Sequence, residues 1–163
     1  KVSNHSFTLA LPDEASTLAM GARLSALLEG SELVFLYGEL GAGKTTFCRG
    51  LLRGLGHSGS VKSPTFTLVE PYELPGGQRV FHFDLYRLFD ANELEYIGID
   101  DYLDSRQLCL VEWPERGADF LPASDVSVFL EPAGDGRQVR IEANSTRGRR
   151  IVGQLTAGQL AAD

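Results

Sequence analysis

Residues Gly38 to Thr46 read G-E-L-G-A-G-K-T-T. This stretch matches the phosphate-loop pattern G-x-x-x-x-G-K-[ST] at every defined position. The apolar run at 33–37 precedes it, and Phe47, Leu51 and Leu55 follow it at helical spacing. This strand–loop–helix context is the one that the pattern requires. The sequence therefore predicts a P-loop domain in which a nucleotide phosphate lies against this loop.

The residues of the loop supply the groups that bind phosphate. Glycines allow the backbone to curl so that successive N–H groups point at phosphate oxygens, and the following helix adds the positive end of its dipole. Lys44 is placed to reach the β- and γ-phosphates, and the Thr45 hydroxyl is a candidate ligand for Mg²⁺. Contacts with the nucleotide are expected from Gly41, Ala42, Gly43, Lys44, Thr45 and Thr46.

Two carboxylates stand at the ends of other largely apolar runs. Asp84 follows the run at 80–83, and Glu112 follows the run at 108–111. Ligands of open α/β sheets gather at the carboxyl ends of strands, and a P-loop site needs a carboxylate to hold Mg²⁺ or to orient water. Both side chains are therefore expected to face the phosphates, provided that their strands lie near the P-loop strand. His82, between apolar neighbours, is expected to be a core or interface residue rather than a base.

The remaining patterns predict one α/β domain over residues 1–163, with a mixed sheet flanked by helices. Strands are expected at 7–11, 32–37, 65–72, 78–85, 108–113, 125–130 and 137–143. Turn residues at 75–77 and 133–136 predict two antiparallel hairpins. Helices are expected at 12–30, from the P-loop to Gly56, and in a short capped segment from Asp90. One face of the first helix is expected to carry Ala15, Leu18, Ala19, Ala22 and Ala26.

Composition narrows the class of protein further. The 163 residues are 43% hydrophobic and 23% charged, and no apolar run approaches the roughly 20 residues that span a bilayer. The net charge of −7 argues against a free-standing nucleic-acid binder. Cys48 and Cys109 are not spaced as a metal-binding pair and are expected to be buried thiols. Arg147, Arg149 and Arg150 are expected to lie on a solvated loop or strand edge.

Two classes of P-loop protein are disfavoured by what the chain contains. The N-K-x-D element that reads guanine does not occur, which argues against a GTPase. A small-molecule kinase usually carries an arginine-bearing lid, and the comparable segment 87–106 is dominated by acids between its terminal arginines. A kinase therefore stays a minor alternative, which transfer of labelled phosphate to a metabolite would reveal.

Several blocks together resemble the bacterial TsaE family, also called YjeE. The P-loop is joined by V-K-S-P-T-F-T-L-V-E at Val61–Glu70, which looks like switch I of that family. F-H-F-D-L-Y-R-L at Phe81–Leu88 looks like its Walker B region, and L-V-E-W-P-E at Leu110–Glu115 looks like its switch II. E-L-E-Y-I-G at Glu93–Gly98 matches as well, and the blocks keep the order and spacing of the family.

The resemblance implies a cytoplasmic ATPase that uses ATP and Mg²⁺ and is required for threonylcarbamoyladenosine at position 37 of tRNAs that read codons beginning with A. In this family the modification is made by the subunit TsaD, which works as a pair with TsaB. Hydrolysis of ATP is thought to reset that pair between turnovers. The resemblance leaves open whether tRNA contacts this chain directly.

The resemblance also assigns roles to residues. Lys44 and Thr45 would bind phosphate and Mg²⁺, and Glu112 matches the switch II carboxylate that ligates Mg²⁺. Asp84 matches the Walker B aspartate, expected to hold the water shell of the metal or to orient the attacking water. Thr65 matches the switch I threonine that senses the γ-phosphate.

Three further positions are carried over to the nucleoside side of the site. Trp113 matches a tryptophan close to the nucleotide, and Glu14 and Gly136 fall where the family encloses the adenosine end. No arginine is evidently placed as a finger, so hydrolysis is expected to be slow alone and faster with the partner pair. The alternative is a nucleotide-gated binding module, in which ATP occupancy rather than hydrolysis controls docking.

Overall fold

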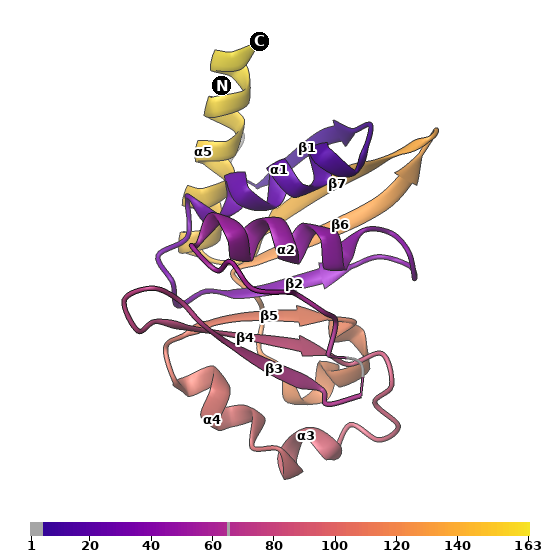
Figure 1. Ribbon diagram of the computed structural model, residues 1–163, viewed down its shortest axis with the longest axis vertical. Helices are drawn as coiled ribbons and strands as arrows, with labels where there is room; N and C mark the ends of the chain where they lie inside the picture. The colour runs from indigo at the N-terminus through magenta and orange to yellow at the C-terminus, as the bar shows by residue number, and fades with distance from the viewer. Residues whose placement is uncertain (1–4, 65) are drawn as a thin grey trace.

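The computed structural model describes residues 5–64 and 66–163 of the chain. Within these residues seven strands form one sheet in the order β1-β7-β6-β2-β5-β4-β3 (Figure 1). The strands are β1 (Ser6–Leu11), β2 (Leu33–Tyr37), β3 (Val69–Glu73), β4 (Arg79–Asp84), β5 (Leu108–Glu112), β6 (Val126–Ala133) and β7 (Gly136–Ala143). The helices are α1 (Glu14–Ser25), α2 (Lys44–Gly54), α3 (Glu93–Tyr96), α4 (Ile99–Asp104), the 3₁₀ segment η1 (Pro114–Phe120) and α5 (Thr146–Ala162).

The centre of the sheet is parallel and its two edges are antiparallel. β2 pairs in parallel with β5 and β6, and β5 pairs in parallel with β4. The β6–β7 hairpin, with β1 beside it, forms one edge, and the β3–β4 hairpin forms the other. The predicted mixed sheet and both predicted hairpins are confirmed. The parallel pairing also brings the carboxyl ends of β2, β4 and β5 to one end of the sheet, where ligands of such sheets bind.

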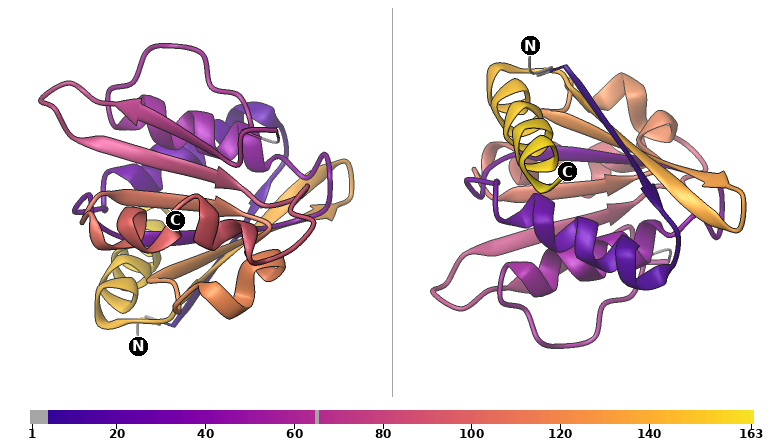
Figure 2. Two further views of the ribbon diagram at one scale, coloured as in Figure 1. Left: turned by 90° about the horizontal axis from the view of Figure 1, so that it is seen from below. Right: turned by 90° about the horizontal axis from the view of Figure 1, so that it is seen from above.

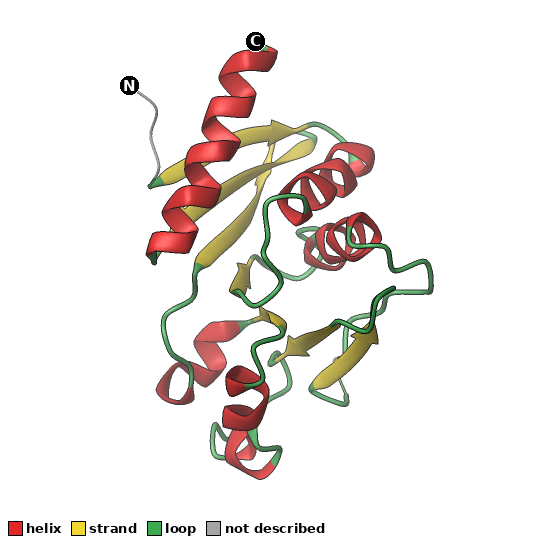
Figure 3. Cartoon of the chain, turned by 90° about the vertical axis from the view of Figure 1, so that its left-hand side faces the viewer, coloured by secondary structure: helices red, strands yellow, loops and turns green. Residues whose placement is uncertain are grey.

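Helices cover both faces of the sheet. The larger hydrophobic core lies between the sheet and the helices α1, α2 and α5. A smaller core on the other face is built around phenylalanines of β2 and β4 and is closed by α3, α4 and η1. Figure 2 shows α1 and α2 side by side, and Figure 3 shows the short helices of the smaller core at the end of the molecule away from α5.

The buried face of α1 differs from the face that the sequence predicts. The helix buries Thr17, Met20, Gly21, Leu24 and Ser25, whereas the predicted alanines at 15, 19 and 26 are exposed. The reason is the close approach of α2, because a Cβ atom on Gly21 would lie 2.2 Å from the carbonyl oxygen of Phe47. Small side chains therefore face the neighbouring helix, and of the predicted face only Leu18 and Ala22, both half-buried, lie against it.

The boundaries of several other helices and strands also differ from those that the sequence predicts. α1 ends at Ser25 rather than near residue 30, and β3 begins only at Val69. The arginines at 147, 149 and 150 lie in the first turn and a half of α5 rather than in a loop or strand edge, and neither α5 nor α4 was predicted. Among the helices of the described residues, none combines the length and the apolar character needed to cross a bilayer.

Candidate functional site

The P-loop connects β2 to α2 as the sequence predicts. Gly41 and Gly43 have φ angles of 79° and 102°, a region that side chains with a Cβ atom rarely adopt. Gly43 is the N-cap of α2, and among the described residues no side chain caps the first backbone N–H groups of this helix. Those N–H groups and the helix dipole are thus directed at the space in front of the loop, which is the geometry of an anion site.

Lys44 lies in the interior of this site and is only 6% exposed. Its ammonium donates a hydrogen bond to the carbonyl oxygen of Gly38 and lies 4.0 Å from the ring centroid of Trp113. Burial lowers the pKa of Lys44, and the nearby carboxylates of Glu112 and Asp84 partly oppose that shift. The lysine is therefore a desolvated cation held between an aromatic face and two acids.

Asp84 and Glu112 are brought together by the sheet. They end the neighbouring parallel strands β4 and β5 and are direct partners in the register. Both are nearly fully buried, at 4% and 2% exposure. A carboxylate oxygen of Glu112 lies 2.6 Å from Nε2 of His82, which is itself fully buried, as the sequence predicts. Both acids line the same cavity as the P-loop, and their roles toward phosphate and Mg²⁺ stay predictions.

The loop before β3 contributes Ser63, which sequence reasoning did not assign to the site. The Ser63 hydroxyl donates a hydrogen bond to Oδ2 of Asp84, and the backbone N–H of Tyr86 donates to Oδ1 of the same carboxylate (2.9 Å). These bonds fix the direction in which Asp84 faces the cavity. The signal for Ser63 was its place in the S-P-T-F-T block, whose Thr65 lies outside the described residues.

Two adjoining cavities meet at the P-loop. The larger, of about 530 Å³, is lined by Lys44, Thr45, Asp84, Glu112 and Trp113 among others. The second, of about 320 Å³, is lined by residues that include Glu14, Thr17, Asp135, Gly136 and Arg137. Gly41, Gly43 and Thr46 line both. The predicted phosphate residues thus face the first cavity, and the two positions assigned to the adenosine end face the second.

Arg137 braces the P-loop, a role that nothing in the sequence indicates. Its guanidinium donates to the carbonyl oxygens of Gly41 (2.8 Å) and Ala42 (3.0 Å) from the start of β7. Gly136 next to it leaves no room for a side chain, since a Cβ atom would lie 2.5 Å from the carbonyl oxygen of Leu11. The β6–β7 hairpin is therefore packed against the P-loop and against the connection from β1 to α1 at Leu11 and Pro12.

Trp113 and Arg87 define the rim of the larger cavity. Trp113 has a left-handed backbone conformation (φ 56°), which is uncommon for a large side chain. Its ring packs against Lys44 and lies 5.0 Å from the ring of Tyr86. Arg87 lines the same cavity, but its guanidinium carbon lies 4.6 Å from the ring centroid of Phe66. The Arg87 guanidinium at the cavity edge thus packs against the exposed ring of Phe66.

The residues present fit a hard divalent cation. The Thr45 hydroxyl and the carboxylates of Asp84 and Glu112 line one cavity, and oxygen ligands of this kind suit Mg²⁺. The cluster of Cys48, His82 and Glu112, whose candidate ligand atoms lie within 4.8 Å of one another, is a second set of potential ligands. It lies deeper, between α2 and the sheet, and all three residues are buried.

The sheet order, the strand–loop–helix unit and the paired acids define an α/β protein of the P-loop NTPase-like class. The family model described as Threonylcarbamoyl adenosine biosynthesis protein TsaE matches residues 11–140. The chain belongs to this TsaE family.

Individual relatives agree with this assignment. The chain is 45% identical over 152 residues to the tRNA threonylcarbamoyladenosine biosynthesis protein TsaE of Haemophilus influenzae, which covers 90% of this chain and 96% of the relative. It is 35% identical over 146 residues to the protein of the same name from Bacillus subtilis, covering 89% of each. Its fold is similar to the crystal structure of YdiB from Bacillus subtilis, with a TM-score of 0.80, 28% identity, and coverage of 94% and 96%.

Proposed function

We propose that this chain binds Mg-ATP at the P-loop and hydrolyses it to ADP and phosphate in support of threonylcarbamoyladenosine formation at position 37 of tRNAs that read codons beginning with A. One observation carries the proposal: Lys44, Thr45, Asp84 and Glu112 line one cavity in front of the amino end of α2. Membership of the TsaE family supports the pathway. The proposed partners are TsaD and TsaB in the cytoplasm, as the family resemblance implies.

Binding would rest on the P-loop and on the two cavities together. Backbone N–H groups at the start of α2 would bind phosphate oxygens, and the Lys44 ammonium would exchange the Gly38 carbonyl for them. The second cavity, with Glu14 and Gly136, would hold the nucleoside. Thr45 and Glu112 would hold Mg²⁺, which supplies charge neutralisation on the β- and γ-phosphates when bound.

Hydrolysis would need no covalent enzyme intermediate. Asp84, fixed by Tyr86 and Ser63, would orient a water so that its oxygen attacks the γ-phosphorus. The bond from this phosphorus to the β,γ-bridging oxygen breaks, ADP leaves, and the proton of the water passes to phosphate or solvent. Lys44 and the loop N–H groups would stabilise the charge on the transferring group.

We expect slow ATP turnover by the isolated chain because of the position of Arg87 at the edge of the phosphate cavity. Arg87 lines the phosphate cavity, but its guanidinium packs over the ring of Phe66, and we infer that it does not act as a finger in the isolated chain. Stimulation by the TsaB–TsaD pair is therefore expected, and hydrolysis would reset that pair. Equal turnover with and without the pair would contradict this part of the proposal.

The test compares ATP binding and hydrolysis by four forms of the chain. Lys44→Ala should abolish nucleotide binding, because it removes the buried ammonium that lines the phosphate cavity. Asp84→Asn and Glu112→Gln should keep measurable binding and lose about 10²- to 10³-fold in hydrolysis. Arg53→Ala is the control, since this exposed cation lies in the last turn of α2, at the end of the helix away from the P-loop. Retained binding in Lys44→Ala would remove the P-loop assignment, and normal rates in both acid variants would remove the catalytic one.

The binding-module alternative is favoured by a separate observation. Phe66 is 84% exposed, and it follows the loop whose Ser63 hydrogen-bonds to Asp84. A change at the phosphate site could therefore alter an exposed aromatic surface without hydrolysis. Multi-turnover tRNA modification by the complex with ATP and with a non-hydrolysable analogue distinguishes the two functions. Equal activity with the analogue would favour the module.

A further inference from the structure

His82 occupies a position whose surroundings are otherwise apolar. It lies on β4 between Phe81 and Phe83, with its side chain on the face of the sheet that α2 covers. Val80, two residues before it on the same face, and Leu110, its register partner on β5, are both fully buried in the larger core. An imidazole buried here must offset its desolvation by hydrogen bonding.

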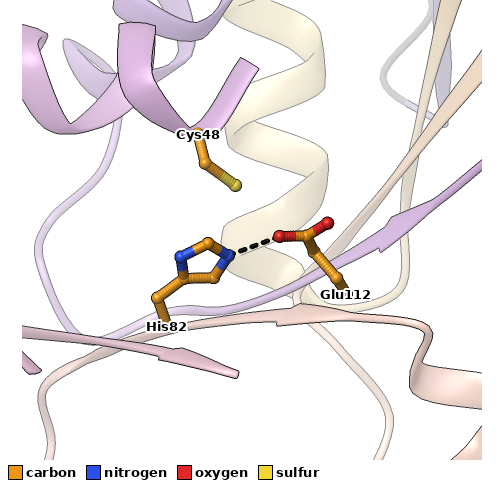
Figure 4. A group of neighbouring side chains, drawn as sticks. All are labelled: Cys48, His82 and Glu112. Atoms are coloured by element: carbon orange, nitrogen blue, oxygen red, sulfur yellow. Dashed lines mark hydrogen bonds and ion pairs between the residues drawn. The ribbon is translucent and has the colours of Figure 1, made fainter. Parts of the chain in front are cut away.

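The described contacts of His82 offer one such bond. Nε2 lies 2.6 Å from Oε2 of Glu112, while Nδ1 is buried without a hydrogen-bond partner among the described residues. Figure 4 shows the imidazole lying beside the Glu112 carboxylate, with the Cys48 thiol above both. A leucine would fill this position without an unpaired polar atom. Packing therefore does not explain the histidine, and its bond to Glu112 does.

We propose that His82 is a positioning residue that holds the Glu112 carboxylate in the orientation needed to ligate Mg²⁺, an inference that rests on the proposed function. Nε2–H donates to one oxygen of Glu112, which leaves the other oxygen for the metal. Partners behind metal ligands fix ligand orientation in this way and tune metal affinity. Because β4 also carries Asp84 two residues further on, one strand positions both acids of the site.

A soft-metal site made of Cys48, His82 and Glu112 is the rival explanation. The residue types suit Zn²⁺, but two ligand atoms on one zinc ion lie about 3.3 Å apart from bond lengths of about 2.0–2.1 Å in a tetrahedral site. The separation of 2.6 Å between His82 and Glu112 is that of a hydrogen bond instead.

The test measures how Mg²⁺ strengthens ADP binding, by calorimetry in EDTA and then over a series of Mg²⁺ concentrations. His82→Leu removes the donor and should raise the Mg²⁺ concentration for half-saturation about 10- to 100-fold. ADP affinity in EDTA should stay within about threefold of the wild type, since the P-loop is untouched. His82→Gln keeps an N–H at similar reach and should restore most of the Mg²⁺ response. Cys48→Ala, in the same cluster, is the control and should match the wild type.

Several outcomes would overturn the inference. A folded His82→Leu protein with an unchanged Mg²⁺ response would show a packing role only, as would equal losses of ADP affinity in EDTA and in Mg²⁺. Should His82→Leu fail to fold, His82→Asn replaces it, because its shorter amide cannot reach Glu112. Equal Mg²⁺ responses in His82→Asn and His82→Gln would then contradict the inference. Wild-type protein that binds ADP without gain from Mg²⁺ would overturn this inference together with the magnesium role proposed for Glu112, but would leave nucleotide binding at the P-loop standing. No ADP binding in either condition would overturn the proposed function itself.

Discussion

Lys44 combines features that rarely meet in one lysine. It is buried at the carboxyl end of the sheet, faces two acids, and packs its ammonium against the single tryptophan of the chain. Desolvation is the larger influence, so the pKa of Lys44 lies below its ordinary value of 10.5 despite the acids. Its charge state is therefore sensitive to alkaline pH, and so is anything that depends on the ammonium.

Nucleotide affinity is expected to fall as the pH rises through this lowered pKa. Above about pH 8 the phosphates of ADP are already fully ionised, so a further change reports the lysine. The folded protein binds fewer protons than the unfolded chain in this window, so the same titration raises the free energy of unfolding as the pH rises. Calorimetric ADP affinities from about pH 8 to about pH 10 check the first effect, and the control Arg53→Ala should show the same pH profile as the wild type. A flat affinity profile in the wild type would show that the ammonium is not titrating or not used.

The sequence predicted the charged residues that a phosphate site requires. It missed residues whose contacts form only when distant parts of the chain come together. Lys44 was recognisable from the P-loop pattern. Asp84 and Glu112 were recognisable because each carboxylate follows a largely apolar run, and a P-loop site needs such an acid. Arg137 was not, because an arginine at the start of a hairpin strand carries no mark of the loop carbonyls that it will meet. The bond of His82 to Glu112 joins β4 to β5, where Leu110 is the register partner of His82 and Glu112 lies two residues further on. The sequence does not give this register, because the two strands are far apart in the chain.

The contact between α1 and α2 shows why the apolar periodicity of the sequence did not predict the buried face of α1. Apolar spacing picks out alanines and leucines, but the contact between these helices runs through glycines that let the backbones approach. On Gly50 of α2 a Cβ atom would lie 2.1 Å from the carbonyl oxygen of Leu18. Helix α5 was missed for another reason, because it begins with a run of arginines and buries only Ile151, Val152 and Leu155 as large side chains.

Gly50→Ala is expected to destabilise the protein by about 1–3 kcal/mol, because the added methyl group forces the two helices apart. Gly158→Ala is the matched control on α5, where the added Cβ atom would meet only an ordinary contact at 3.6 Å. That variant should stabilise the protein by up to about 1 kcal/mol through helix propensity. Thermal or urea unfolding of both variants measures the difference. Equal changes in the two would show that the α1–α2 crossing is not as close as described.

For the whole molecule, the important feature is that residues from both halves of the sheet line the two cavities at the P-loop. The antiparallel edge provides Gly136 and Arg137, and the parallel centre provides Asp84 and Glu112. The P-loop lies between them and lines both cavities. The family model ends at residue 140, so α5 lies beyond the matched region although its apolar face completes the larger core. Family resemblance alone therefore located the site but not the element that closes the fold.

A nucleotide that fills both cavities should stabilise the molecule as a unit. At a concentration of Mg-ADP about 100 times its dissociation constant, the gain is about 2.7 kcal/mol. This corresponds to about 5–11 °C in melting temperature for a chain of this size. Lys44→Ala should show no such shift in melting temperature, and the control Arg53→Ala should show all of it. Hydrogen exchange adds the spatial test, because slower exchange should appear both around Gly136 and around Asp84 and Glu112. Protection confined to one side would mean that the ligand occupies one cavity and that the other serves something else.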